Sequence, residues 1–338
     1  MTHPTSPTAL ALAALLSLSA FSAQAQSDVR IYGLLDLSLG SVKDVGSSTR
    51  KTVLDSGKLT TSYYGMSGSE DLGGGLSGLF KLEGFLRADT GAQGRFDNDP
   101  QFSRTASVGL SHKELGTLTL GRNTTALFVS TLSFNAFGDS FGYSPSIRHY
   151  FGAGQAAVTG DTGWSDSVSY SSPTWNGLRF GLAVAAKEAN PSTISNGGNW
   201  SANLGYAQGP LAAALVVQDV EKDGTSTVAD TRTTQLNASY DFGLAKAFAQ
   251  YAKVENRSIS DSDTTLSGLG VRVPAGQGAV IAQWSQSSPA KGADRNTTSI
   301  GYLYPLSKRT ELYAVGMYDG KDGSSAGHAY SVGMRTRF

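Results

Sequence analysis

The feature that most constrains this chain is an alternation of apolar and polar side chains with a period of two. In the stretch RIYGLLDLSLG, Ile31, Leu35 and Leu39 fall on one side, and Arg30 and Asp36 fall on the other. Successive side chains of a β-strand point to opposite faces, so this period predicts strands. The alternation recurs along the chain, and no comparable period of 3.6 residues follows residue 25. We therefore expect an all-β fold.

Charged side chains stand within these strands on the polar side. Lys81 and Glu83 lie in LSGLFKLEGFLRAD, and Arg335 and Arg337 lie in YSVGMRTRF. A dry core does not tolerate such charges, whereas a water-filled lumen does. Aromatic residues stand at the apolar strand ends beside tight turns, as in the interfacial girdle of a membrane barrel. These residues are Tyr206, Tyr240, Phe242, Tyr302, Tyr304 and Phe338. The alternative is a soluble all-β protein, a secreted sandwich or propeller.

Short and long connections alternate along the chain and set the number of strands. Seven tight turns, such as EDLGGG, HKELG and YPLSK, alternate with eight longer polar segments. This pattern predicts sixteen antiparallel strands, with short periplasmic turns and long extracellular loops, in a transmembrane β-barrel. The long segments are expected at about 43–57, 90–101, 124–162, 188–198, 221–229, 256–264, 287–295 and 319–327.

The first residues predict a secretory signal peptide. An apolar segment ends in Ala23-Gln24-Ala25, a small-x-small cleavage pattern, although no Lys or Arg precedes that segment. We expect residues 1–25 to be removed, which leaves 26–338 as the barrel domain. The chain has no cysteine, which excludes disulfides and thiol catalysis. Lys plus Arg equals Asp plus Glu, at 27 each, so net charge gives no support to a nucleic-acid partner.

Several motifs occur in the order and at the turn positions of one known family. They are RIYGLLD, GSEDLGGGLSGLFKLEG, SVGLSHKELGTLTLGR, SDSVSYSSPTWNGLRF, YPLSKRT and the terminal aromatic residue. The chain resembles the Gram-negative general porins, trimeric sixteen-stranded channels, over its whole length after residue 25. The resemblance implies an outer-membrane homotrimer without a cofactor, in contact with the lipid bilayer and lipopolysaccharide, that lets small hydrophilic solutes diffuse passively. It also implies that Phe338 is part of the signal read by the outer-membrane assembly machinery.

The same family folds its third long loop into the lumen and faces it with three arginines. Two of them are replaced here, by Tyr63 and near Gly163, whereas Arg122 keeps the third. The acidic turn of the family's loop corresponds to NAFG at 135–138, with Asp139 as the nearest acid. We expect a less charged constriction than in the family. The expected residues of the constriction loop are Phe134, Phe137 and Gly138.

The position of Arg122 conflicts with the alternation of its own strand. Arg122 has the same parity as Leu118 and Leu120, which are expected to face lipid, so it reaches the lumen only if Gly121 forms a bulge. Arg104 has the same conflict with the residues that follow it. By parity alone, the inward-facing charges are Arg30, Asp36, Lys81, Glu83, Arg87, Arg179, Arg272, Arg335 and Arg337.

Fixed charges beside a water column select which ions enter. Our hypothesis is a weakly selective channel, tilted toward anions by Arg122 and Lys81. The alternative for each charge is a solvated wall residue paired with a neighbour. The loop aromatics either narrow the pore or, as we favour, pack the loop onto the wall. They are Phe134, Phe137, Phe141, Tyr143, Tyr150 and Phe151.

Other functions remain as alternatives: a substrate-specific porin, and less favoured a barrel enzyme or an adhesin. An enzyme requires a nucleophile beside an oriented base, and Ser144, Ser146 and Asp139 do lie near His149. Serine is abundant in this chain, so we give this proximity little weight. Acidic pairs occur in the loops but show no convincing metal-ligand spacing, and we expect no metal site. They are Asp97 with Asp99, and Asp261 with Asp263.

Overall fold

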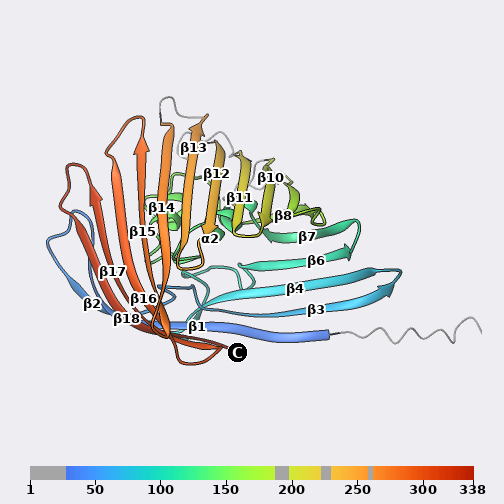
Figure 1. Ribbon diagram of the computed structural model, residues 1–338, viewed down its shortest axis with the longest axis horizontal. Coiled ribbons are helices and arrows are strands. Elements are labelled where there is room, and N and C mark those ends of the chain that lie inside the picture. The colour runs from blue at the N-terminus through green and yellow to red at the C-terminus, as the bar shows by residue number, and fades with distance from the viewer. Residues whose placement is uncertain (1–27, 187–197, 222–229, 258–261) are drawn as a thin grey trace, which may run out of the picture.

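The computed structural model describes residues 28–186, 198–221, 230–257 and 262–338. Its strands form one antiparallel sheet that closes on itself, because β1 (Asp28–Lys43) pairs with both β18 (Gly327–Arg337) and β3 (Tyr63–Gly73) (Figure 1). Closure leaves no free sheet edge, which is the condition for a β-structure to stand in lipid. The predicted all-β barrel is confirmed.

The remaining strands follow one another around the wall. They are β2 (Lys51–Ser56), β4 (Leu76–Arg87), β5 (Ala92–Gln93), β6 (Thr105–His112), β7 (Gly116–Thr124), β8 (Gly163–Ser171), β9 (Leu178–Ala185), β10 (Trp200–Gln208), β11 (Leu211–Val220), β12 (Thr231–Asp241), β13 (Lys246–Asn256), β14 (Thr264–Ala275), β15 (Gly278–Pro289), β16 (Arg295–Pro305) and β17 (Thr310–Lys321).

Two wall strands are interrupted, and β2 and β5 are their segments nearer the long loops. β2 pairs with the same strand, β1, as β3 does, and residues 57–62 separate the two segments. In the same way β5 and β6 both pair with β4, and residues 94–104 separate them. Counting each interrupted pair once gives the predicted sixteen wall strands. The first long connection is therefore shorter than expected, because part of 43–57 is strand β2.

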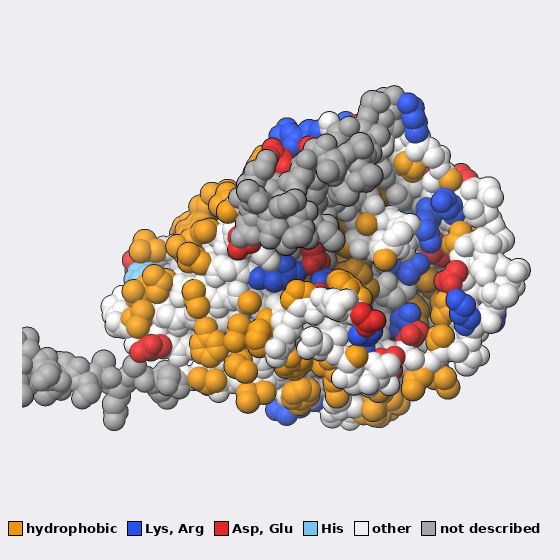
Figure 2. All heavy atoms as spheres, turned by 180° about the vertical axis from the view of Figure 1, so that it is seen from behind, with side chains coloured by type: hydrophobic (Ala, Val, Ile, Leu, Met, Phe, Trp, Pro, Cys, Tyr) orange, Lys and Arg blue, Asp and Glu red, His pale blue; other side chains and the backbone are white. Residues whose placement is uncertain are grey.

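The two faces of the wall differ as the alternation predicts. Ile31, Leu236 and Val332 are exposed on the outer face to 77%, 58% and 61%. Asp36 and Gln235, on the opposite face, are fully buried. Figure 2 shows hydrophobic side chains gathered over much of the outer surface. A wall with an apolar outer face and a polar inner face suits lipid outside and water inside.

Two short helices lie inside the barrel and were not predicted. α2 (Ala126–Ser133) and α3 (Pro145–Phe151) belong to the connection between β7 and β8 (Figure 1). Thr125 and Ser144 cap them, each accepting a hydrogen bond from a backbone N–H in the first turn. Helices of about two turns are too short to show a periodic signal.

No helix in the described part of the chain is long and apolar enough to cross a membrane. The predicted signal peptide, residues 1–25, lies outside the described residues.

Candidate pore constriction

The connection between β7 and β8 folds into the barrel and packs on one side of its wall. Phe137 and Tyr143 join a buried cluster with Ile281 and Tyr313 of β15 and β17. Tyr150 joins a second cluster with residues of β11, β13 and β14. Phe137, Tyr143 and Tyr150 therefore pack the loop onto the wall, as favoured above, and Phe151 packs against the second cluster.

The turn that includes residues 135–138 is held by one amide side chain. Asn135 donates from Nδ2 to the carbonyl oxygens of Thr131 and Gly138, at 2.7 and 2.8 Å. Its Oδ1 accepts hydrogen bonds from the backbone N–H of Phe137 and from Oγ of Ser144. Gly138 has a φ of 58°, a conformation that favours glycine. The neutral side chain of Asn135 thus shapes the turn.

Buried amides of the wall also hold the loop. Gln283 of β15 accepts from the backbone N–H of Ala136 at 2.8 Å and donates to Oγ of Ser146 at 2.7 Å. Gln235 of β12 donates to Oγ1 of Thr131 at 2.8 Å. These bonds fix the loop in position because each side chain involved is buried and has its polar partner within the protein.

The first strand interruption, residues 57–62, turns inward and braces the tip of the loop. Asp36 accepts from the backbone N–H groups of Leu59 and Thr60, at 2.8 and 2.7 Å, and from the Tyr313 hydroxyl at 2.6 Å. The carbonyl oxygen of Lys58 in turn accepts from Oγ of Ser140 at 2.7 Å. Asp36 therefore serves as the anchor of this segment.

The second interruption, residues 94–104, braces the end of the loop. Arg95 forms ion pairs with Asp99 and with Asp161, each at 2.9 Å. Arg122 also pairs with Asp161, at 2.5 Å, and donates to the carbonyl oxygen of Ser103. Burial opposes ionisation of Asp161, but the hydrogen bond and charge of Arg95 and the charge of Arg122 outweigh it, so its pKa falls to about 2.

Arg122 reaches the inside of the barrel through a shift in register. The pairing of β7 with β8 shifts between Gly121 and Asn123, and Gly121 has a φ of 120°. A positive φ in a strand interior is characteristic of a glycine bulge. This is the rearrangement that the parity conflict of Arg122 requires.

Two cations share one carboxylate on the wall formed by β4 and β6. Glu83 pairs with Lys81 at 3.1 Å and with Arg104 at 3.3 Å, and it accepts from the Tyr32 hydroxyl. The Arg104 guanidinium also stacks over the Tyr63 ring, 4.3 Å from its centroid. The side chain of Arg104, whose direction the alternation did not decide, therefore faces the lumen. This cluster carries one more cation than carboxylates.

Arg335 links the last strand to the loop. It pairs with Glu311 at 2.8 Å and donates from Nη1 to Oγ1 of Thr60 at 2.8 Å. Thr60 donates to the carboxylate of Asp139 at 3.2 Å. Burial raises the pKa of Asp139 above its ordinary value, against the opposing charges of Arg104 and Arg335.

A further cluster lies toward the long-loop end of the barrel, beside a cavity of about 770 Å³ between the loop and β16–β18. Asp319 pairs with Arg148 of α3 at 2.8 Å and with Arg295 at 2.6 Å. The fully buried His149 bonds Oγ1 of Thr297 at 2.8 Å, and Thr297 donates to Asp319. The bonding partner of His149 is therefore a threonine of the wall, and not the serines considered above.

Two other predicted charges pair with acids outside the connection between β7 and β8. Arg87 pairs with Asp97 at 2.7 Å, and Arg30 pairs with Asp28. The acidic loop pairs named above are divided among cations, with Asp97 on Arg87, Asp99 on Arg95 and Asp263 on Lys253. Asp261 lies outside the described residues. No group of three metal-ligating side chains occurs in the described ranges.

Sequence reasoning missed several residues that hold the loop. They are Arg95, Arg148, Asp161, Arg295 and Asp319. All five lie in or beside the long connections, where alternation gives no signal. The inward charges Arg179, Arg272 and Arg337 have no carboxylate within ion-pair distance among the described residues.

Comparison with known proteins gives consistent matches over nearly the whole chain. Residues 9–324 match the family described as Gram-negative porin. Outer membrane porin protein 32 of Delftia acidovorans is 32% identical over 327 residues, which are 94% of this chain and 91% of the relative. An outer membrane porin protein of Bordetella pertussis is 28% identical over 97% of this chain and 99% of its own length.

Solved structures show the same fold. The anion-selective porin from Comamonas acidovorans superposes with a TM-score of 0.78 at 26% identity, covering 93% of this chain and all of that one. OmpT of Vibrio cholerae in its trimer form superposes with a TM-score of 0.67 at 16% identity, over 92% of this chain and 99% of that one.

Proposed function

This chain belongs to the Gram-negative porin family, and from that premise we propose that it forms a water-filled channel for passive diffusion of ions and small hydrophilic solutes. It is an outer-membrane protein, as its relatives are. Those relatives are channel proteins and not enzymes, so the enzyme alternative is set aside. The predicted homotrimer remains a proposal, supported by the trimer form of the Vibrio cholerae structure.

We propose further that the channel is tilted weakly toward anions. The observation that carries this proposal is the sharing of Glu83 by Lys81 and Arg104. The carboxylate neutralises one of the two cations, which leaves a positive charge on the wall that faces the loop. The similarity to an anion-selective porin supports the same sign.

The role of Arg122 in this proposal is smaller than the sequence suggested. Its guanidinium pairs with Asp161 and donates to Ser103 and Ser165, and its side chain is only 18% exposed. We therefore assign Arg122 mainly to anchoring the end of the loop, and Lys81 with Arg104 to the anion preference.

Reversal potentials in a planar bilayer across a potassium chloride gradient test the proposal. The double variant K81Q/R104Q should lower the chloride-to-potassium permeability ratio at least about threefold, since a unit charge about 6 Å from an ion in water contributes ~0.7 kcal/mol. E83Q should raise the ratio. R50Q is the control, because Arg50 donates to the hydroxyl of Tyr330, a residue exposed on the outer face of the wall. A wild-type preference for potassium, or an unchanged ratio in the double variant, would contradict the anion preference.

A further inference from the structure

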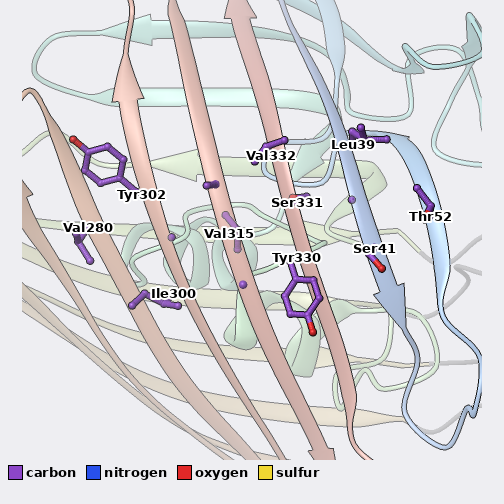
Figure 3. A pocket seen from close by; sticks show the side chains of 14 residues that line it. Leu39, Ser41, Thr52, Val280, Ile300, Tyr302, Val315, Tyr330, Ser331 and Val332 are labelled. Atoms are coloured by element: carbon purple, nitrogen blue, oxygen red, sulfur yellow. The ribbon is translucent and has the colours of Figure 1, made fainter.

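A hollow lies on the inner face of the wall, between α2 and strands β8 to β11, with a volume of about 310 Å³. This volume is at the lower end of the range of pockets that hold small ligands. A groove of about 690 Å³ lies on the opposite, outer face of the wall, where Figure 3 shows Ile300, Tyr302 and Val332 around it. That groove faces lipid, so of the two only the inner hollow faces a solute dissolved in the lumen.

The strand register brings an arginine and two small residues together at the short-turn end of the hollow. Arg179 of β9 pairs with Gly205 of β10, and Gly205 pairs with Ala214 of β11. A Cβ on Gly205 would lie 3.6 Å from Cγ and Nε of Arg179, so the arginine side chain lies over the glycine. No carboxylate of the described chain lies within ion-pair distance of Arg179. Its N–H groups are therefore available to a ligand.

The next row of the sheet, toward the long loops, adds an amide and a hydroxyl. Gly181 of β9 lies between Ser171 of β8 and Asn203 of β10. A Cβ on Gly181 would lie 2.5 Å from Oδ1 of Asn203, so the amide fills the space that the glycine leaves open. Within the described ranges, the side chains of Ser171 and Asn203 form no hydrogen bond.

One row farther, the buried Ser201 also lines the hollow, and its Oγ has no hydrogen-bond partner in the described part of the chain. A buried polar group without a partner costs free energy, so a ligand hydroxyl is favoured near it. The wall side of the hollow thus presents several polar groups that the protein itself leaves without partners. A few convergent polar groups of this kind are what orients a small ligand in a pocket.

The opposite side of the hollow belongs to α2 and is largely apolar. Val129 is 40% exposed, and Ala126 and Phe134 line the hollow with it. Ser133 donates from Oγ to the carbonyl oxygen of Val129 at 2.6 Å, which leaves its Oγ able to accept a hydrogen bond. The hollow therefore has one apolar side and one polar side.

We propose that this hollow binds a monosaccharide, with the C–H face of the sugar against Val129 and Phe134 and its hydroxyls on Arg179 and Asn203. The proposal rests on the diffusion channel proposed above and names a class of solute for it. A sugar hydroxyl both donates and accepts, as the amide and the serine hydroxyls do, so one sugar can pair with all of these groups. A simple carboxylate only accepts, so it would use Arg179 and leave Oδ1 of Asn203 without a donor. We therefore commit to the sugar.

Noise that glucose adds to the current of single channels in a planar bilayer tests the proposal. Glucose in the hollow should interrupt the ion current reversibly, and the dependence of the noise on glucose concentration gives the half-saturating concentration. R179M and N203A each remove hydrogen-bonding groups, and A214L fills the hollow. Each should raise the half-saturating concentration about tenfold, the change expected for the loss of about one hydrogen bond.

R272M and A212L are the matched controls and should leave the half-saturating concentration unchanged. Arg272 is an inward charge of β14 that also lacks a carboxylate among the described residues, and Ala212 is a small inward residue of β11. Neither residue lines the hollow. Heat-dependent migration on a gel verifies that each variant folds.

The outcomes separate the site from the channel. An open channel whose current glucose leaves free of added noise would overturn the site and leave the diffusion channel standing. Equal half-saturating concentrations in R179M, N203A, A214L and the unmodified protein would do the same. A folded protein that conducts no ions would overturn both proposals. Acetate at constant ionic strength should not displace glucose, and displacement would overturn the sugar in favour of organic anions.

Discussion

At the scale of single residues, Asp36 connects the wall to the loop. It is fully buried, and its carboxylate accepts three hydrogen bonds, from Leu59, Thr60 and the Tyr313 hydroxyl. Leu59 belongs to the same buried cluster as Phe137. One carboxylate thus holds the inward turn against which the tip of the loop packs, so its effect extends beyond its own strand.

We expect D36A to loosen the loop while the barrel still forms. The substitution leaves two backbone N–H groups and one hydroxyl without their buried acceptor, at a cost of about 3 kcal/mol or more. The temperature at which the folded band converts on a gel should fall, and single-channel current should become noisier. S38A is the control, because Ser38 is a buried neighbour on the same strand that takes no part in the three hydrogen bonds of the Asp36 carboxylate. Equal behaviour of D36A and S38A would contradict the anchoring role.

At the scale of elements, two interrupted strands brace one loop from two sides. Residues 57–62 contact its tip through Lys58 and Ser140, and residues 94–104 contact its end through Arg95 and Asp161. Both interruptions occur in strands that run from the long loops toward the short turns. The wall therefore lacks ladder hydrogen bonds at these two interruptions, and the residues of the interruptions hold the loop in a fixed position.

The alternation in the sequence predicted the strands because each strand has lipid on one face and water on the other, so successive residues alternate between apolar and polar. It predicted the inward side of Asp36, Glu83 and Arg335 for the same reason. It did not predict that Asp161 pairs with Arg95 and Arg122, because that contact depends on how far the loop folds back. The interruptions were missed because a strand that turns inward and resumes resembles a loop followed by a strand.

Acid should weaken the contact between α3 and the wall. Burial lowers the pKa of His149 from 6.5 to about 4, with Arg295 and Arg148 adding to the effect and Asp319 opposing it. Between pH 4 and pH 6.5, His149 is protonated when the loop is undocked and neutral when the loop is docked. Docking is therefore strongest above pH 6.5 and weakens as the pH falls, by ~3 kcal/mol at pH 4.

Cleavage of the loop by a protease, measured across this pH range, tests the expectation. H149Q keeps a side chain able to bond Thr297 but does not titrate, so its cleavage should depend less on pH. H112Q alters a partly exposed histidine that bonds the carbonyl oxygen of Gly74 at a short turn, and it should respond as the unmodified protein does. Identical pH dependence of H149Q and the unmodified protein would remove His149 from the effect.

At the scale of the whole molecule, the barrel depends on a single seam between its first and last strands. β18 pairs with β1 from Leu34↔Arg337 to Lys43↔His328. Phe338 then continues the seam, exchanging backbone hydrogen bonds with Gly33 at 3.1 and 3.2 Å. A Cβ on Gly33 would lie 2.4 Å from the Phe338 ring, so the ring is in close contact with the first strand. The ring is also 51% exposed toward the lipid side.

Removal of Phe338 should reduce the number of barrels in the membrane far more than it changes each channel. The seam loses two terminal hydrogen bonds and one aromatic contact, while the side chains around the loop, such as Glu83 and Arg104, keep their positions. We expect less heat-modifiable protein in the outer membrane and an unchanged single-channel conductance. F242A is the control, because Phe242 is a girdle aromatic at another short turn and is 61% exposed. An equal loss of folded protein in F242A would attribute the effect to the girdle in general, whereas an altered conductance without Phe338 would show that the seam shapes the pore.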